Sequence, residues 1–359
     1  MKIVIFGLSI TSSWGNGHAT LWRGLCRALV ARGHDVSFFE RDVPYYARTR
    51  DLHDLPGGQL VLYPDWSTVR RFARGEVEEA DVALVTSYCP DAAVFAEEMI
   101  GKAALSVFYD LDTPVTLSRL AGGQTVEYLG ERALRDFDLV LSYTGGAALE
   151  ELQTQLGARR VAPLYGSVDP DFHQPVEPRA NYRGDLSFLG TYAEDRQAAL
   201  QNLFIESARR RAEASFVIGG ALYPPSFPWA RNISFVRHLP PAEHPAFFCS
   251  SRLTLSVTRR AMALMGYCPS GRLFEAAACG IPILTDWWMG MEEFFDPCEE
   301  IIPVRGAEEV LLALDLPEKV LKTIARAARE RVLAEHTAEC RAEQFEDRMQ
   351  EAMSPSVEV

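Results

Sequence analysis

The chain alternates between short apolar runs and amphipathic stretches. Runs rich in Val, Ile, Leu and Phe are typical of strands that are buried on both faces, as in a parallel sheet. Between the first two runs, Leu21, Leu25 and Leu29 recur at helical spacing and Gly33 follows, which predicts a β-α-β unit. The predicted strands are 3–6, 36–39, 60–63, 82–86, 104–109, 139–142, 161–164, 186–189, 215–218, 233–236, 253–257, 281–284 and 301–304.

The alternation is interrupted once, between residues 165 and 183. This segment contains Pro170, Pro175 and Pro178 and has little apolar periodicity, so it is typical of a linker. We therefore predict an α/β protein of two Rossmann-like domains, 1–170 and 185–335, joined by a linker at 171–184. Residues 336–359 are expected to form a helix starting at Thr337 that packs back across the junction, with a frayed tail at 354–359.

Composition narrows the function classes. The 359 residues include 36 Lys and Arg against 49 Asp and Glu, a net charge of −13, which disfavours nucleic acid as the main partner. No apolar run approaches the ~20 residues of a membrane span, and the N-terminus has no basic leader, so we expect a cytoplasmic protein. Seven cysteines without a CxxC pair indicate neither a disulfide framework nor a zinc site.

A glycine-containing loop follows the first predicted strand. Gly15, Asn16 and Gly17 would allow a ligand to approach the backbone and the amides of the next helix, although a plain tight turn is the alternative. The loop is not a full dinucleotide fingerprint, because Thr20 replaces the last glycine, even though Glu40 ends the second strand as an NAD site requires. An NAD-dependent function rests on these two features only.

Candidate acid–base residues lie at the ends of the first-domain strands. His18 follows the glycine loop and is a candidate general base, or a structural histidine. Asp110 and Asp112 follow the strand at 104–109, and one of them could orient His18; we select Asp110, because Asp112 equally fits a helix cap. Parallel sheets bind ligands outside the carboxyl ends of their strands, so we expect the site in the cleft between the domains.

The second domain carries the more specific candidates. Ser270 and Gly271 begin a short helix whose free amides, together with Arg272, could hold a diphosphate. One turn later, Glu275 could accept hydrogen bonds from both ribose hydroxyls, or it could be a solvated helical residue.

A strand, a glycine turn and a helix also occur around residue 190. Gly190 would permit close approach of a ligand, and Arg196 could reach a phosphate or pair with Glu194 or Asp195. His238, just after a strand, could line the pocket for the base.

These segments resemble a known family. The stretches FLGTYAEDR and GRLFEAAACGIPILT, with RALVARGHDV after the first loop, are similar to glycosyltransferases of the GT-B fold, in particular the CgeB-like branch of the group 1 (GT4-like) superfamily. The resemblance spans nearly the whole chain. It implies that Arg196 holds the diphosphate and that Glu275, the second glutamate of the EX7E motif, binds the ribose. Tyr267 stands where the first glutamate is expected, and His18 resembles the base of inverting enzymes, so the stereochemistry stays open.

The function implied by this resemblance is hexosyl transfer from a nucleotide diphosphate sugar, with a UDP-sugar favoured, to a small-molecule or glycan acceptor. The donor would bind to the second domain and the acceptor to the first, with no metal ion and no cofactor other than the donor. Two alternatives remain: a nucleotide-sugar 2-epimerase of the same fold, and a non-catalytic carbohydrate- or nucleotide-binding protein. The acceptor and the oligomeric state are left open.

Overall fold

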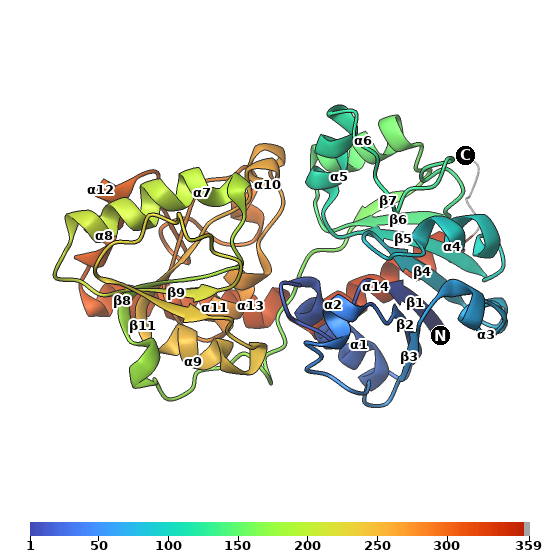
Figure 1. Ribbon diagram of the computed structural model, residues 1–359, viewed down its shortest axis with the longest axis horizontal. Helices are drawn as coiled ribbons and strands as arrows, with labels where there is room; N and C mark the ends of the chain where they lie inside the picture. Colours follow the sequence, from blue (N-terminus) through green and yellow to red (C-terminus); the bar gives the residue numbers. More distant parts are fainter. Residues whose placement is uncertain (355–359) are drawn as a thin grey trace. The chain divides into compact units, whose positions relative to one another are not determined.

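The computed structural model describes residues 1–354, which divide into two compact units (Figure 1). The first unit comprises residues 1–165 and the C-terminal segment from Ala338, and the second comprises Gly166–Thr337. Of the predicted tail at 354–359, residues 355–359 lie outside the described part. Among the described residues, no helix combines the length and apolar character that crossing a membrane requires.

The first unit contains a seven-stranded parallel sheet. Its strand order is β3-β2-β1-β4-β5-β6-β7. The strands are β1 (Lys2–Gly7), β2 (Asp35–Arg41), β3 (Gln59–Tyr63), β4 (Val82–Thr86), β5 (Leu105–Asp110), β6 (Leu139–Ser142) and β7 (Val161–Pro163). The helices are α1 (His18–Ala31), α2 (Pro44–Ala47), α3 (Trp66–Glu78), α4 (Ala92–Met99), α5 (Thr113–Ala121), α6 (Ala147–Leu156) and α14 (Ala338–Met353).

The second unit contains a six-stranded parallel sheet in the order β10-β9-β8-β11-β12-β13. The strands are β8 (Gly184–Leu189), β9 (Phe216–Gly220), β10 (Ile233–Arg237), β11 (Ser251–Ser256), β12 (Ile283–Thr285) and β13 (Ile302–Pro303). The helices are α7 (Glu194–Leu200), α8 (Glu206–Arg210), α9 (His244–Cys249), α10 (Arg260–Met265), α11 (Gly271–Ala278), α12 (Ala307–Leu314) and α13 (Glu318–Glu335). Two parallel α/β sheets confirm the predicted fold class.

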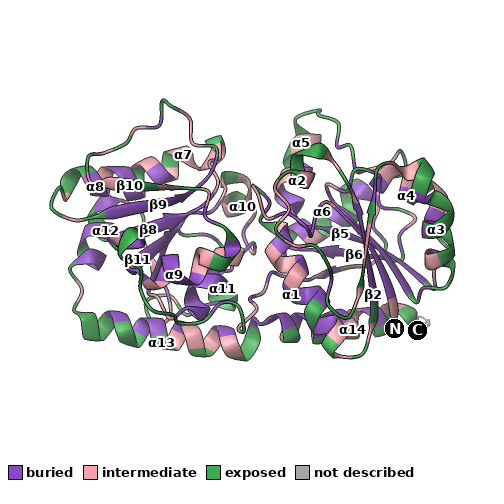
Figure 2. Ribbon diagram, turned by 60° about the horizontal axis from the view of Figure 1, so that its bottom comes forward, coloured by how far each residue is buried: buried purple, intermediate pink, exposed green. Residues whose placement is uncertain are grey.

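Burial explains why the apolar runs form central strands. Every residue of β4 and of β5 is buried, and Figure 2 shows the central strands of both sheets in the buried colour. On α1, Trp22 is 1% exposed and packs edge-on against Phe38 and Tyr109. Helix α1 therefore covers the first sheet through large aromatic contacts, which contribute apolar burial and ring-edge attraction.

The C-terminal helix belongs to the first unit, although the preceding helix α13 belongs to the second. The guanidinium of Arg32, at the end of α1, donates two hydrogen bonds of 2.8 Å to Glu346 on α14. His34 adds a contact of 2.6 Å between its Nε2 and the same carboxylate. A bidentate pair of this kind fixes the two helices in one register.

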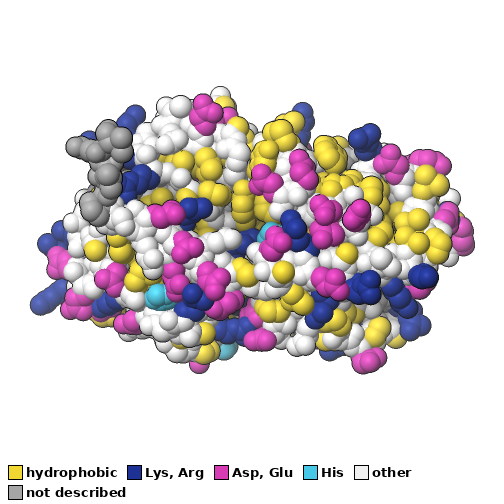
Figure 3. Space-filling model, turned by 180° about the vertical axis from the view of Figure 1, so that it is seen from behind, with side chains coloured by type: hydrophobic (Ala, Val, Ile, Leu, Met, Phe, Trp, Pro, Cys, Tyr) yellow, Lys and Arg dark blue, Asp and Glu magenta, His cyan; other side chains and the backbone are white. Residues whose placement is uncertain are grey.

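The surface carries charge of both signs. On the face drawn in Figure 3, acidic and basic side chains are interspersed with apolar ones. The negative net charge is therefore not gathered into one acidic region on this face.

Candidate functional site

Each sheet has one position where the chain direction across the sheet reverses. In the first unit the connections diverge between β1 and β4, and in the second between β8 and β11. Ligands of open parallel sheets bind outside the carboxyl ends of the strands at such positions. The predicted glycine loop follows β1, and Gly190 follows β8, so both predicted loops lie at these switch points.

Glycines at the ends of β8 and β9 make room for a side chain from α7. A Cβ built on Gly190 would lie 3.1 Å from Nη1 of Arg196, and one on Gly220, whose φ is +153°, would lie 2.0 Å from the Gly190 carbonyl oxygen. That carbonyl also accepts a hydrogen bond of 3.0 Å from the Tyr223 hydroxyl. Gly220 therefore has to be glycine, whereas a side chain at Gly190 would displace the Arg196 guanidinium by a few tenths of an ångström.

The Arg196 guanidinium has no carboxylate partner among the described residues. Its Nη1 donates one hydrogen bond of 3.3 Å to the Thr191 carbonyl, and its Nε is buried without a hydrogen bond. Among the described residues Arg196 forms no ion pair with Glu194 or Asp195, and Asp195 instead accepts a hydrogen bond of 3.0 Å from Nε of Arg259. Burial and the nearby positive charge of Arg272 lower the Arg196 pKa to about 10. No ion pair neutralises this charge within the described part of the chain, which favours an anionic ligand.

The start of α11 supplies further donors. Its first residue is Gly271, and the preceding Ser270 has an extended backbone and makes no side-chain cap bond. The first amides of the helix are therefore left for a ligand or solvent. Arg272 lies in this first turn and makes no ion pair within the described part of the chain. Two unpaired guanidiniums and a helix N-terminus lie in the same unit.

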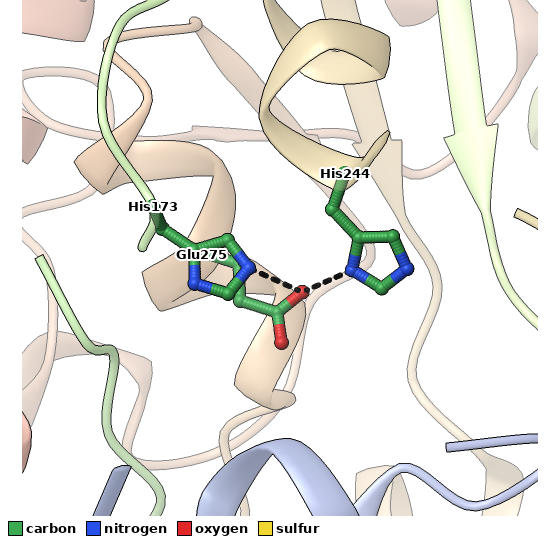
Figure 4. Close-up of side chains that lie close together, drawn as sticks. All are labelled: His173, His244 and Glu275. Atoms are coloured by element: carbon green, nitrogen blue, oxygen red, sulfur yellow. Dashed lines mark ion pairs between the residues drawn. The ribbon is translucent and has the colours of Figure 1, made fainter. Parts of the chain in front are cut away.

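Glu275 is a buried residue, not a solvated helical one. Its Oε2 lies 3.9 Å from Nε2 of His173 and 3.5 Å from Nδ1 of His244, as Figure 4 shows. Burial alone would raise the pKa of Glu275, but the two neighbouring histidine side chains and the positive charge of Arg272 hold it below the usual range of a glutamate. Burial lowers the His173 pKa to about 4. Glu275 is therefore an ionised carboxylate close to the positive charge of Arg272. The same charge lowers the pKa of Arg196.

In the first unit, His18 is the first residue of α1 and faces an aspartate. Its Nε2 lies 3.7 Å from Oδ2 of Asp112, with side-chain exposures of 21% and 13%. The His18 ring lies 5.9 Å from the ring of Tyr88, which has a φ of +65° at the end of β4. Burial and the negative charge of Asp112 raise the Tyr88 pKa. A histidine, a carboxylate and a strained tyrosine therefore meet at the β1/β4 switch point.

We predicted that Asp110 orients His18, but the aspartate that faces His18 is Asp112. Strand β5 extends one residue beyond the predicted end, so Asp110 is its last, fully buried residue. One Asp110 oxygen accepts a hydrogen bond of 3.1 Å from the Asp112 amide. Burial raises the Asp110 pKa to about 6. Asp110 therefore holds the turn that presents Asp112 to His18, and Asp112 makes no side-chain cap to α5.

Asn16 has an internal role that differs from the predicted ligand contact. Its amide donates hydrogen bonds to the carbonyls of Ser9 at 2.9 Å and Ser12 at 3.1 Å, and its Oδ1 accepts one from the His18 amide at 3.1 Å. All its polar atoms are therefore used in bracing the loop. The flanking Gly15 has a φ of +60°, whereas Gly17 is helical.

Glu40 does not serve as the acid of an NAD site. Its side chain is fully buried. It accepts hydrogen bonds from the amides of Ile10 and Thr11 and from the hydroxyls of Ser9 and Thr11. A carboxylate with four donors inside the first loop has no free position for a ribose, so Glu40 explains the shape of the loop instead.

Comparisons with known proteins bear on the family and the fold. Residues 196–347 match the family described as glycosyl transferase-like. No curated protein matches the sequence closely enough to count as a relative. Among solved structures, sucrose-phosphate synthase from Thermosynechococcus elongatus has 14% identity and a TM-score of 0.66, covering 98% of this chain and 99% of that one.

Two further solved structures are similar over the same length. HepE of Anabaena, in complex with UDP-glucose, has 13% identity and a TM-score of 0.69, covering 98% of this chain and 100% of that one. An alpha-glucosyltransferase in complex with UDP and a DNA 13-mer has 13% identity and a TM-score of 0.72, covering 98% and 99%. The chain therefore has the GT-B fold, and its residues 196–347 match the glycosyl transferase-like family.

These similarities confirm the predicted GT-B fold. The CgeB-like branch and the EX7E correspondence stay predictions. Tyr267 has a φ of +49°, and its amide donates a hydrogen bond to the Met289 carbonyl at 2.7 Å. Its ring packs where a Cβ on Gly290 would clash, so the residue in place of the first glutamate closes a turn.

Several residues near the two guanidiniums were not predicted. Asp286 follows β12 and accepts hydrogen bonds from the Thr258 amide at 2.8 Å and hydroxyl at 3.0 Å; burial raises its pKa to about 6, against the opposing charge of Arg196. Its place directly after a strand was a usable signal. Tyr223 had none. His238, predicted to line the base pocket, has a φ of +49° at the end of β10 and donates its amide to the Gly220 carbonyl at 2.7 Å.

Proposed function

We propose that this protein transfers a hexosyl group from a UDP-sugar to a small-molecule or glycan acceptor. The observation that carries the proposal is the pair of unneutralised guanidiniums, Arg196 and Arg272, beside the uncapped start of α11. A diphosphate is the ligand whose charge and geometry match two guanidiniums and a helix N-terminus. Solved structures of similar fold hold UDP or UDP-glucose, which supports uracil as the base of the donor.

The donor contacts follow from this arrangement. Arg196 and Arg272 bind the diphosphate, and Glu275 accepts hydrogen bonds from the ribose hydroxyls through the oxygen that does not face the histidines. As the bond between the anomeric carbon and the diphosphate oxygen breaks, negative charge accumulates on the leaving UDP. The guanidiniums stabilise that charge where it develops, so the transfer step needs no metal ion at the diphosphate.

The acceptor contacts are assigned to the first unit. The acceptor oxygen bonds to the anomeric carbon, and its proton passes to His18 in an inverting reaction or to a donor phosphate oxygen in a retaining one. Asp112 faces His18 at 3.7 Å, which suits a carboxylate that orients an imidazole and stabilises its protonated form. In the inverting course, the dyad of His18 and Asp112 is therefore the base.

Thermal unfolding with UDP tests the donor site. We expect saturating UDP, with no divalent metal added, to raise the melting temperature, and Arg196→Met and Glu275→Ala each to remove most of this rise. Arg211→Met is the matched control, because Arg211 is an arginine of the same unit that is bound by Asp315. A rise that survives in both site variants would overturn the proposed donor site.

A further inference from the structure

The cluster of His173, His244 and Glu275 contains four buried side-chain atoms that no hydrogen bond satisfies, and three of them lie close together. Both nitrogens of His173, Nδ1 of His244 and Oε2 of Glu275 are buried and have no hydrogen-bond partner. His173 is 1% exposed. Buried polar groups are normally paired, and an unpaired set facing one point indicates a missing bound species.

The tautomer of His244 makes the arrangement more specific. Its Nε2 lies 3.3 Å from the Leu239 carbonyl oxygen, which can only accept, so Nε2 carries the proton. In the neutral ring, Nδ1 then presents a lone pair to the Glu275 oxygen at 3.5 Å. Two lone pairs repel each other unless a proton or a metal ion lies between them, and these two atoms form no hydrogen bond with each other. A ring N–H donated to a backbone carbonyl is also the usual arrangement behind a metal-bound histidine.

We infer that His173, His244 and Glu275 bind one divalent transition-metal ion, with Zn²⁺ as the best match. One ligand atom from each residue lies within 4.8 Å of the other two. A tetrahedral ion with bonds of about 2.1 Å holds its ligands about 3.4 Å apart, so a shift of less than about 1 Å per atom closes the site. Two imidazoles and one carboxylate suit Zn²⁺ or Co²⁺ rather than Mg²⁺ or Ca²⁺.

This ion is separate from the transfer chemistry. It would bind the Glu275 oxygen that faces the histidines and leave the other oxygen for the ribose. Only the ribose contact rests on the proposed function. The ion would hold the carboxylate in one orientation and join α9 and α11 to the segment that carries His173. Its role is therefore to orient the Glu275 carboxylate from the side of the two histidines, without contact to the diphosphate.

Metal binding by the full chain, without UDP, tests the inference. We expect one Co²⁺ per chain with visible absorption bands of a tetrahedral site, and one Zn²⁺ per chain by equilibrium dialysis and elemental analysis. Glu275→Gln and His244→Gln should each weaken Zn²⁺ binding at least tenfold, whereas His53→Ala, an exposed histidine of the first unit, should not.

Two outcomes would overturn the inference. One is the absence of Co²⁺ bands together with Zn²⁺ binding weaker than that of typical surface histidines. The other is equal Zn²⁺ binding by the site variants and the control. His244 is at the edge of the cluster, with a side-chain exposure of 14%, so its variant is expected to fold even if a His173 variant does not. UDP binding is measured separately, so failure of the metal site and failure of the donor site are distinguishable.

Discussion

Replacing Arg196 by methionine should stabilise the free protein while removing its affinity for UDP. Burial and the neighbouring Arg272 lower the Arg196 pKa from 12.5 to about 10, which corresponds to about 3 kcal/mol against the charged form in the folded state. The side chain keeps some solvent contact, and the variant loses the hydrogen bond to Thr191. We therefore expect a gain of about 1–2 kcal/mol.

The sign of the pH dependence follows from the lowered pKa. Because the folded pKa is below the unfolded one, the destabilisation is fully present below about pH 10 and is relieved only as the pH rises from about 10 to 12.5. The difference between variant and wild type should thus be constant from pH 6 to 9. For a unit of this size, a gain of about 1–2 kcal/mol corresponds to a rise in melting temperature of about 3–6 °C.

Differential scanning calorimetry with and without UDP measures both effects. The control Arg211→Met removes two hydrogen bonds of 2.8 Å to Asp315, so it should leave the melting temperature unchanged or lower it and keep the UDP-induced rise. If Arg196→Met melted below the wild type, or kept the UDP-induced rise, Arg196 would not be an uncompensated cation that awaits a diphosphate.

Three further changes test other parts of the structure. Glu346→Gln removes a carboxylate whose pKa is lowered to about 2 by its hydrogen bonds with Arg32. Near neutral pH we expect the free energy of unfolding to fall by about 1 kcal/mol and hydrogen exchange in α14 to become faster. The wild type should lose the same contribution as the pH falls from about 4.5 to 2. Gly190→Ala places a methyl group 3.1 Å from the Arg196 guanidinium and should weaken UDP binding roughly tenfold, about 1.4 kcal/mol, by calorimetric titration. Asp112→Asn should lower the rate of sugar transfer by about 10²–10⁴-fold in a UDP-release assay and leave UDP binding unchanged; an equal loss of UDP binding would contradict its placement on the acceptor side.

The fold was predictable because its signal is local. A fully buried parallel strand needs an apolar run, and β4 begins and ends where the run at 82–86 does. Local signals also predict that Arg196 and Arg272 lie in the first turns of their helices, as they do in α7 and α11. Asp110 shows the limit: one more residue of β5 turned it into a buried strand residue and left Asp112 to face His18.

The surroundings of Glu275 were not predictable, because they are made by tertiary contacts. His173 lies in the proline-rich segment that has no periodicity, and His244 begins a short helix after β10. Nothing in either local pattern indicates that the two imidazoles converge on one carboxylate. Only the folding of the second unit brings three separate segments of the chain together there.

The assignment of Glu275 to the ribose is the central claim, and a thermodynamic cycle tests it most directly. Calorimetric titration would compare UDP with 2′-deoxy-UDP on the wild type and on Glu275→Ala, with Glu275→Gln as a second variant that keeps the side-chain volume. We expect a coupling free energy of about 1–2 kcal/mol between the carboxylate and the 2′-hydroxyl. A coupling free energy near zero, with both proteins folded and binding UDP, would contradict the assignment.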